Sequence, residues 1–216
     1  MMKPIIFNTN MVQAILSGRK TVTRRVVKPH PQFRDGETGT PVLMDDGSWE
    51  FQIDQYRNIS DYTINPPYQT GDILYVRETW RVYEASSAGT CTIEYKAGGM
   101  VKFNRILALP TTKGEWKPSI HMPKEAARIF LSVTNVRVER LRDITPAQID
   151  SEGCKEYAYN ANTGELLPSG PSWFRVIWDS TIKPADLPLY GWDANPWVWV
   201  IEFERIPDQV VKLATP

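Results

Sequence analysis

Apolar and polar positions alternate in four segments of the chain, and this pattern predicts β-strands. The segments are rich in β-branched and aromatic residues, as half-buried strands are. They cover residues 73–83, 90–96, 129–141 and 197–206. In the last one, Trp197, Trp199 and Phe203 fall on one face and Glu202 falls on the other. The pattern therefore predicts a fold in which strands predominate.

The segment 129–141 changes its apolar phase partway along. Val133 belongs to one alternating series and Val136 to the other, so the side chains would exchange faces between them. This predicts a bulge or bend at Thr134 and Asn135. Such a bend suits a small, curved β-barrel.

Three short helices are predicted by their end signals. They cover residues 11–17, 146–152 and 171–178. The first follows a cap provided by one of the residues 8–10 and ends at Gly18 in a left-handed conformation. The second begins with Thr145 and Gln148 at capping-box spacing and ends at Gly153.

The length of 216 residues is enough for one well-buried core. We expect a single domain over residues 1–206, with irregular insertions at 28–69 and 155–172 and a C-terminal tail at 207–216. Both insertions are rich in Pro, Gly, Asn and Asp and lack periodicity. No apolar run is long enough to span a membrane and no secretion signal is evident, which predicts a cytoplasmic protein.

The net charge of the chain bears on the kind of nucleic acid that it could bind. The chain has 25 Lys plus Arg and 25 Asp plus Glu, so its overall field would not attract long nucleic acid. A local basic patch nevertheless lies near the N-terminus. It contains Arg19, Lys20, Arg24, Arg25 and Lys28, with no acidic residue among them. A solvated surface stretch and a nucleic-acid contact both fit this patch.

Neither a metal site nor a cofactor is predicted. The two cysteines, Cys91 and Cys154, lie far apart and have no metal-ligand spacing, and the only histidines are His30 and His121. We interpret both cysteines as ordinary thiols.

The basic patch also holds a pair of residues suited to acyl chemistry. Lys20 and Thr23 follow the turn expected at Gly18. A lysine whose pKa is lowered by burial can take the proton of a threonine hydroxyl and so activate it as a nucleophile. The pair by itself is a weak signal.

Two glutamates occupy unfavourable positions. Glu152 lies in the last turn of a predicted helix, where the negative end of the helix dipole disfavours an acid. Glu78 shares the apolar face of its strand with Val76 and Trp80, so it should be paired or functional. We expect Glu78 to pair with Lys20 or with an arginine.

Three sequence motifs resemble those of a known family. They are the run GRKTVTRR at Gly18 to Arg25, the turn TGDIL at Thr70 to Leu74 and the segment LRDITPAQIDSEG at Leu141 to Gly153. Together they resemble the ASCH domain, a PUA-related family. The further motifs VRETW, WKPSIHMP and WDANPW, which begin at Val76, Trp116 and Trp192, resemble the larger ASCH proteins of phages and prophages.

The resemblance implies an α+β fold, a PUA-like mixed β-barrel with a few short flanking helices. It also implies a cleft for RNA or a modified nucleobase, with RNA or a modified nucleoside as partner. One branch of the family removes the acyl group from N4-acetylcytidine with a lysine, a threonine and a glutamate. These fall on Lys20, Thr23 and Glu152, although this chain is about twice the usual size of that branch.

The implied mechanism gives each residue a role, and we expect the three to converge on one cleft. Lys20 would accept the proton of Thr23, whose oxygen attacks the amide carbonyl, and Glu152 would protonate the leaving amine. Arg24, or backbone amides near Gly18, would stabilise the oxyanion. In the alternative interpretation, Lys20 and Glu152 form a salt bridge and Thr23 is an ordinary strand residue.

Several further residues are candidate ligand contacts. They are Arg19, Arg24, Arg25, Glu78, Trp80, Trp116, Lys117 and His121. Aromatic rings stack on bases in single-strand binders, although most tryptophans at strand or helix spacing belong to a core. Trp116 lies in a loop and is the stronger candidate, and a structural histidine is a reasonable alternative for His121.

Three classes of function remain compatible with the sequence. The chain binds RNA or a modified nucleoside beside GRKTVTRR, or it hydrolyses an N4-acylated cytidine, or it is a phage accessory protein that acts on a host protein without catalysis. If the chain is phage-encoded, its location would be the host cytoplasm.

Overall fold

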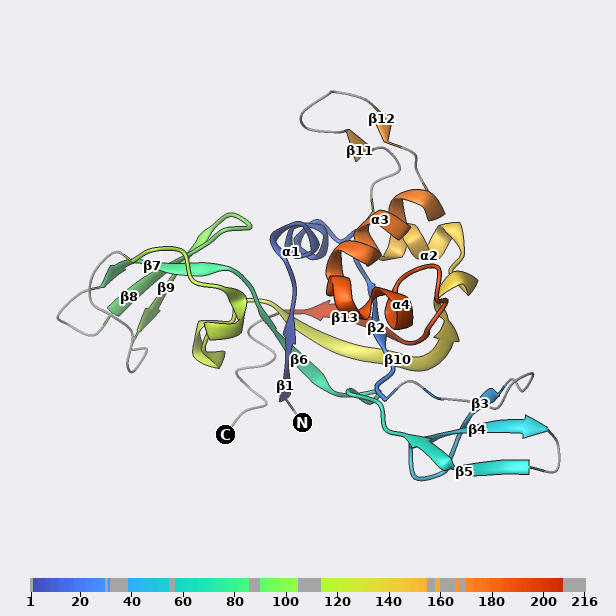
Figure 1. Ribbon diagram of the computed structural model, residues 1–216. Coiled ribbons are helices and arrows are strands. Elements are labelled where there is room, and N and C mark those ends of the chain that lie inside the picture. Colours follow the sequence, from blue (N-terminus) through green and yellow to red (C-terminus); the bar gives the residue numbers. More distant parts are fainter. Residues whose placement is uncertain are drawn as a thin grey trace. The chain divides into compact units, whose positions relative to one another are not determined.

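The computed structural model describes most of the chain (Figure 1). The described residues are 2–29, 31, 39–54, 57–85, 90–104, 114–154, 158–159, 166–167 and 170–207. Within them the fold is a mixed α+β fold in which strands predominate over a few short helices, as the sequence predicts.

The strands form one larger sheet and smaller antiparallel ones. The five-stranded sheet has the order β1-β6-β10-β13-β2. Its strands are β1 (Met2–Ile6), β6 (Ile73–Arg77), β10 (Phe130–Arg140), β13 (Trp197–Ile206) and β2 (Val22–Val26). The three-stranded sheets are β3 (Thr40–Leu43), β4 (Trp49–Asp54) and β5 (Arg57–Ile64), and β7 (Trp80–Ala85), β8 (Thr90–Tyr95) and β9 (Met100–Asn104). Strands β11 (Ala158–Tyr159) and β12 (Leu166–Leu167) form a short pair.

The helices are α1 (Thr9–Leu16), α2 (Pro146–Ser151), α3 (Pro171–Thr181) and α4 (Leu187–Tyr190). Asn8 caps α1 by accepting from the Met11 N–H, and Gly18 follows the helix with a φ of 74°. Thr145 and Gln148 form the predicted capping box of α2, and Gly153 has a φ of 81°. The end signals in the sequence therefore located α1 and α2 correctly, whereas α3 runs beyond the predicted 171–178 and α4 was not predicted.

Contacts divide the chain into two compact units. The first contains residues 1–20, 71–133 and 203–216, and the second contains residues 21–70 and 134–202. Strands β10 and β13 each run from one unit into the other. The single domain predicted for residues 1–206 remains a prediction.

The first unit has a core built on the sheet β7-β8-β9. Strand β1 runs parallel to β6, and β6 pairs with the start of β10 in antiparallel fashion. The inward residues of β7, β8 and β9 alternate with outward ones and pack against the segment that precedes β10. The buried members are Trp80, Val82, Cys91, Ile93, Tyr95, Met122, Ala126, Ala127 and Phe130. Cys91 is buried, as expected of an ordinary thiol, and burial raises the pKa of that thiol.

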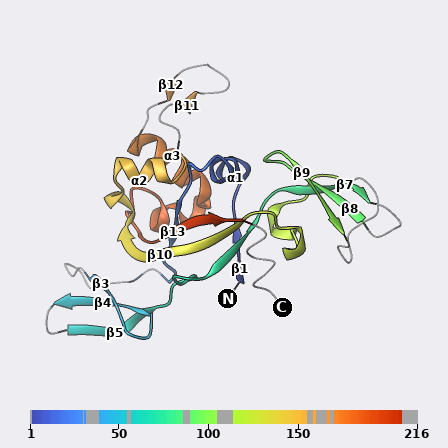
Figure 2. The ribbon, with the colours of Figure 1, turned by 180° about the vertical axis from the view of Figure 1, so that it is seen from behind.

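The second unit buries both faces of β13. Val198 and Val200 pack with apolar side chains of α2 and α3, two helices that lie side by side in Figures 1 and 2. Trp197 and Trp199 point to the other face, where the rings of β4 contact them. The predicted alternation of β13 is correct. Both of its faces are nevertheless apolar, because one face packs against the helices α2 and α3 and the other against strand β4.

Two expectations about the strands need correction. The strand predicted over residues 73–83 is interrupted, because β6 ends at Arg77 and β7 begins at Trp80. Residues 40–54 and 57–64, predicted to be irregular, form the sheet β3-β4-β5. The turn at Asp46 and Gly47 joins two of these strands, and such short strands between turn residues carry little periodicity.

The change of phase predicted in β10 is present. Thr134 and Asn135 are both exposed; Leu131 and Val133 are buried before them and Val138, of the other parity, is buried after them, while Phe130 is buried too. The predicted loop 155–172 and the predicted tail 207–216 lie mostly outside the described residues.

Candidate functional site

The segment GRKTVTRR begins in the first unit and ends in the second. After α1, the Lys20 N–H donates to the carbonyl of Ala14 at 3.1 Å, so the chain folds back on the helix end. The side chain of Lys20 is only 2% exposed, and its Nζ lies 5.6 Å from the centroid of the Phe7 ring. Burial of a lysine beside an aromatic ring is unusual and excludes the interpretation of a solvated position.

Thr23 and Arg24 follow on β2, in the second unit. This strand pairs with β13 in antiparallel fashion, with Thr23 opposite Ile201 and Arg24 opposite Val200. Because neighbouring side chains on a strand point to opposite faces, Thr23 and Arg24 leave β2 in opposite directions. Both are nonetheless buried, with exposed fractions of 1% and 3%.

The guanidinium of Arg24 donates to three side chains, those of Glu139, Gln148 and Glu152. We call these four residues the Arg24 cluster. Arg24 Nη1 donates to Glu152 Oε1 at 3.2 Å, and its Nη2 donates to Gln148 Oε1 at 3.1 Å and to Glu139 Oε2 at 3.4 Å. Among the described residues, the buried Nε of Arg24 has no hydrogen-bond partner. A buried donor left unpaired costs about 1–3 kcal/mol.

Local structure explains why Glu152 reaches this arginine. The capping box starts α2 and fixes its direction, and Glu152 is the C-terminal cap of that helix. The Thr21 N–H donates to the carbonyl of Ser151 at 2.8 Å, which ties the end of α2 to the start of β2. The acid that appeared misplaced at a helix end is therefore compensated by a guanidinium.

A second arginine acts on the same carboxylate. Burial lowers the pKa of Arg25, and the negative charge of Glu152 and then Tyr68 oppose that change. Arg24 and Arg25 occupy neighbouring positions of β2, so their side chains leave the strand on opposite faces. Glu152 therefore interacts with Arg24 through a hydrogen bond and with Arg25 through its charge.

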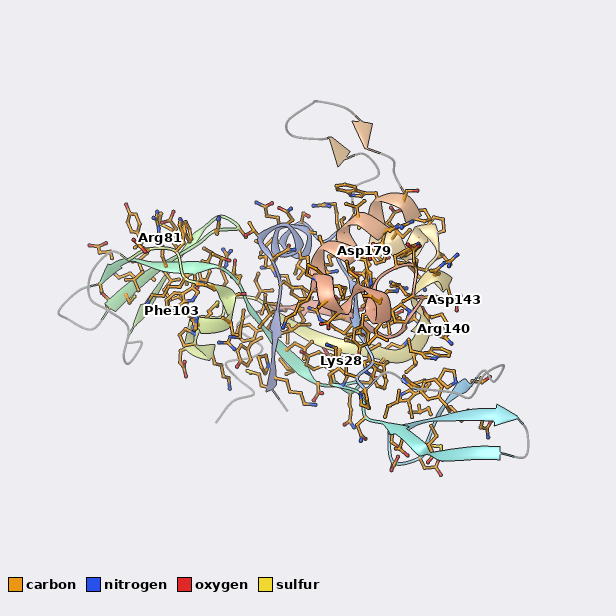
Figure 3. The ribbon with its side chains drawn as sticks, in the orientation of Figure 1. Lys28, Arg81, Phe103, Arg140, Asp143 and Asp179 are labelled. Carbon is orange, nitrogen blue, oxygen red and sulfur yellow. The ribbon has the colours of Figure 1, made fainter. Side chains whose placement is uncertain are left out.

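The Arg24 cluster continues to the surface as a chain of alternating charges. Glu139 also accepts from Arg137, and Arg137 donates to Glu202 on β13. Nearby, at the end of β10, Figure 3 shows Arg140 and Asp143, the acid that opposes the lowering of the Arg140 pKa by burial. The basic patch on β2 is therefore balanced by acids supplied by β10, α2 and β13.

Glu78 lies in the first unit and is paired with an arginine, as predicted. Arg128 donates to both carboxylate oxygens at 2.9 Å, and its guanidinium carbon lies 4.0 Å from the centroid of the Tyr95 ring. Burial raises the pKa of Glu78, and the hydrogen bonds and charge of Arg128 oppose that rise. This ion pair is local to the first unit and is compatible with a structural role.

The predicted aromatic contacts separate into a buried and an exposed residue. Trp80 belongs to the core of the first unit, so its ring is withdrawn from solvent. Trp116 is 37% exposed, and the guanidinium of Arg81 lies 4.5 Å from its centroid. Arg81, labelled on β7 in Figure 3, is oriented by Glu94 at 2.6 Å. Trp116 is therefore the ring that a base could reach.

The remaining predicted contacts lie on the surface of the first unit or near it. Lys117 pairs with Trp80 through backbone hydrogen bonds, and its Nζ lies 5.3 Å from the Trp80 ring centroid. His121 is exposed in a 3-10 turn, and Arg19 is exposed with its Nε donating to Ser17. None of these positions by itself distinguishes a ligand contact from an ordinary surface residue.

Sequence reasoning missed four residues that complete these clusters: Arg128, Glu139, Gln148 and Tyr68. The spacing of Gln148 from Thr145 was noticed in the sequence, but it was fully explained by the capping box, so it gave no reason to expect a contact with Arg24. Glu139 and Arg137 lie two positions apart and so share one face of their strand, and charged residues at this spacing are typical of any exposed strand face. Their roles arise from contacts between residues that are distant in sequence, which no local pattern reveals.

Other features of the described part of the chain do not extend the predicted site. It contains no group of three or more His, Cys, Asp or Glu side chains that could hold a metal ion. A hollow beside β3 and β4 is lined by Val42, Leu43, Met44, Asp45, Glu50 and Gln52 and includes none of the predicted site residues. None of the described helices is long and apolar enough to cross a membrane.

The chain was compared with protein families, curated proteins and solved structures. No family model, no curated protein and no solved structure matches it. The resemblance to the ASCH domain therefore rests on the sequence motifs, and the grouping of Lys20 with Thr23 and Glu152 stays a prediction.

Proposed function

We propose that the chain binds RNA or a modified nucleoside next to GRKTVTRR, on a PUA-like fold, and hydrolyses the acyl group of an N4-acylated cytidine. The observation that carries the proposal is the burial of polar residues. Seven polar or charged side chains are buried among the described residues, and five of them are residues that the sequence had nominated: Lys20, Thr23, Arg24, Glu78 and Glu152. Burying such groups is costly, so a protein retains them for structure or for chemistry.

Thr23 and Lys20 keep their predicted roles in this proposal. The Thr23 hydroxyl is the nucleophile that attacks the acyl carbonyl, and Lys20 is the base that takes its proton. The acyl group passes to the Thr23 oxygen as the C–N bond breaks, and water then releases it. A buried hydroxyl gains most from such a base, because solvent does not compete for the proton.

The ion pair with Arg24 changes the role proposed for Glu152. Glu152 Oε1 already accepts a hydrogen bond from Arg24 Nη1 at 3.2 Å in the resting protein, so that contact would have to change before Glu152 could serve the leaving amine. The ammonium that forms when Lys20 takes the Thr23 proton is then the better donor to the leaving amine. Glu152 instead stabilises positive charge and orients Arg24.

A screen of the unmodified protein tests the proposal. We expect the protein to convert N4-acetylcytidine to cytidine and acetate, and chromatography measures this conversion. Before it is consumed, N4-acetylcytidine should also raise the melting temperature of the protein. Cytidine and N4-acetylcytosine show whether the acyl group or the ribose is recognised. Failure of every acylated nucleoside and every short RNA to be hydrolysed or to raise the melting temperature would contradict the proposal.

Trp116→Ala is expected to weaken the binding of a short single-stranded RNA by roughly ten- to a hundredfold, because one stacked base contributes about 1–3 kcal/mol. Trp116→Phe should retain most of the affinity. Leu189→Ala is the matched control, since Leu189 is also an exposed apolar side chain. Fluorescence anisotropy of a labelled oligonucleotide measures the affinities, and equal binding by all three variants would exclude Trp116 as a stacking residue.

A further inference from the structure

We propose that a hollow on the sheet β3-β4-β5 is a docking site for one lysine side chain of a partner protein. We call it the β3 hollow, and all of its lining residues belong to the second unit (Figure 1). They are Val42, Leu43, Met44, Asp45, Glu50 and Gln52. None of them belongs to the proposed nucleoside site, so the docking site is independent of that function.

The pairing of β3 with β4 decides which side chains face the β3 hollow. Val42 lies opposite Glu50, so the two side chains share one face of the sheet with their Cβ atoms about 5 Å apart. Phe51, the next residue of β4, points to the other face and contacts the ring of Trp197. Strand β4 therefore turns an aromatic side toward β13 and leaves Glu50 on the side of the hollow.

The size and the apolar wall of the β3 hollow suit one extended side chain. Its volume is about 230 Å³, below the roughly 300–1,000 Å³ of pockets that take a drug-sized molecule. Val42, Leu43 and Met44 supply consecutive apolar side chains, and Leu43 is 58% exposed. A lysine can lay its apolar stem along such a wall and keep its ammonium in contact with water.

The charge around the β3 hollow complements an ammonium. Residues 40–54 contain four acidic residues and no basic one. Asp46 has a role in the turn, because its carboxylate accepts from the hydroxyl and the N–H of Ser48, and both bonds lower the pKa of Asp46. Asp45 and Glu50 have no ion pair with any described residue. Two lining carboxylates thus remain to attract a cation from outside the chain.

The free edge of β3 favours recognition of a side chain over the addition of a strand. Among the described strands, β3 pairs with β4 alone. The Met44 N–H donates across the turn to the carbonyl of Ser48, and such donors alternate along an antiparallel pair, so Pro41 faces the free edge. Proline has no N–H to offer, which makes this edge a poor template for another strand.

A protein lysine fits the β3 hollow better than a free polyamine does. A lysine side chain carries one charge at the end of an apolar stem. A polyamine carries an ammonium at both ends of each apolar stretch, so one charge would lie against the wall formed by Val42, Leu43 and Met44.

The test titrates a blocked pentapeptide into the unmodified protein and follows it by ¹H–¹⁵N NMR. The peptide has lysine at its centre and glycine and serine elsewhere. We expect saturable shifts of the backbone signals of residues 42–45 and 50–52, with a dissociation constant in the millimolar range because exposed ion pairs are weak. Added salt should weaken the binding.

Two further probes identify the occupant. The same peptide with norleucine in place of lysine keeps the stem without the charge and should bind at least about threefold more weakly. Equal binding of the two peptides, or no saturable shift with the lysine peptide, would overturn the inference. Tighter binding of spermidine than of the lysine peptide would show a polyamine site and would overturn it as well.

A double variant gives a second readout. Asp45→Asn combined with Glu50→Gln removes both charges with little change of shape and should weaken binding of the lysine peptide by about fivefold, the loss of two exposed ion pairs. Asp150→Asn, at an exposed position of the same unit, is the matched control. Circular dichroism shows whether the variants are folded. Wild-type affinity in the folded double variant would overturn the inference.

Discussion

Lys20→Arg is expected to lower the rate of N4-acetylcytidine hydrolysis by about a hundred- to ten-thousandfold, the usual contribution of a general base. Arginine keeps the positive charge but cannot release its proton near neutral pH. The expected cause is the loss of the base for Thr23, and substrate binding should change much less than the rate. Chromatographic assays of the rate and measurements of affinity separate the two effects.

Two comparisons control for the size and charge of the new side chain. Lys20 is 2% exposed, so a larger residue can disturb packing, and the melting temperature of Lys20→Arg must be compared with that of Lys20→Met. Both variants should be folded and inactive. If Lys20 only contacts a phosphate, Lys20→Arg will retain activity, and Lys20→Ala will weaken RNA binding by an amount that shrinks as salt is raised.

Arg128→Met is expected to lower the free energy of unfolding by about 3–5 kcal/mol at pH 7, because it leaves a buried carboxylate without its partner. Glu78 is 1% exposed and accepts two hydrogen bonds from Arg128. Methionine can still cover the Tyr95 ring but removes the guanidinium that lies 4.0 Å from its centroid, so the expected loss includes that cation–π contact as well as the ion pair. Urea denaturation measures the free energy.

The pH dependence of this variant distinguishes electrostatics from packing. Burial raises the pKa of Glu78 above its unfolded value, and Arg128 opposes this rise. A raised carboxyl pKa contributes stability that is present below the unfolded pKa and is lost as pH rises through the folded pKa. Removal of Arg128 raises the folded pKa further, so Arg128→Met should lose more stability at pH 7 than at pH 4.

The matched control for this prediction is Arg81→Met. Its ion pair with Glu94 is about one quarter exposed on both sides, so its loss should cost at most about 1 kcal/mol. Equal losses in Arg81→Met and Arg128→Met, or a loss in Arg128→Met that is the same at both pH values, would show that the Glu78 ion pair is not the source of stability.

The sequence predicted the elements whose signals are local. The end of α1 at Gly18, the capping box of α2 and the extent of β13 follow from neighbouring residues, and the structure confirms them. The sheet β3-β4-β5 was missed because its strands are short and interrupted by turn residues. The break at Glu78 was missed because its cause is tertiary: the Glu78 N–H donates to Met122 Sδ and its carboxylate pairs with Arg128.

The candidate site was predictable in its residues but not in its pairings. A misplaced acid at a helix end and an acid on an apolar strand face both indicated buried charge, and both residues are buried. Their partners, Arg24 and Arg128, lie 128 and 50 positions away, and the single sequence contains no signal that joins them. The catalytic assignment is a consequence of the resemblance and depends on the hydrolysis assays.

The double use of one amide oxygen restricts how position 148 can vary. A capping box accepts glutamine or glutamate equally well. Here Gln148 Oε1 receives both the Thr145 N–H and Arg24 Nη2, so glutamate would satisfy the helix but bring a third carboxylate to a single guanidinium. The amide sets the helix start without disturbing the charge of the Arg24 cluster. In relatives of this chain, an exchange at position 148 should therefore be accompanied by a change at Glu139 or Glu152.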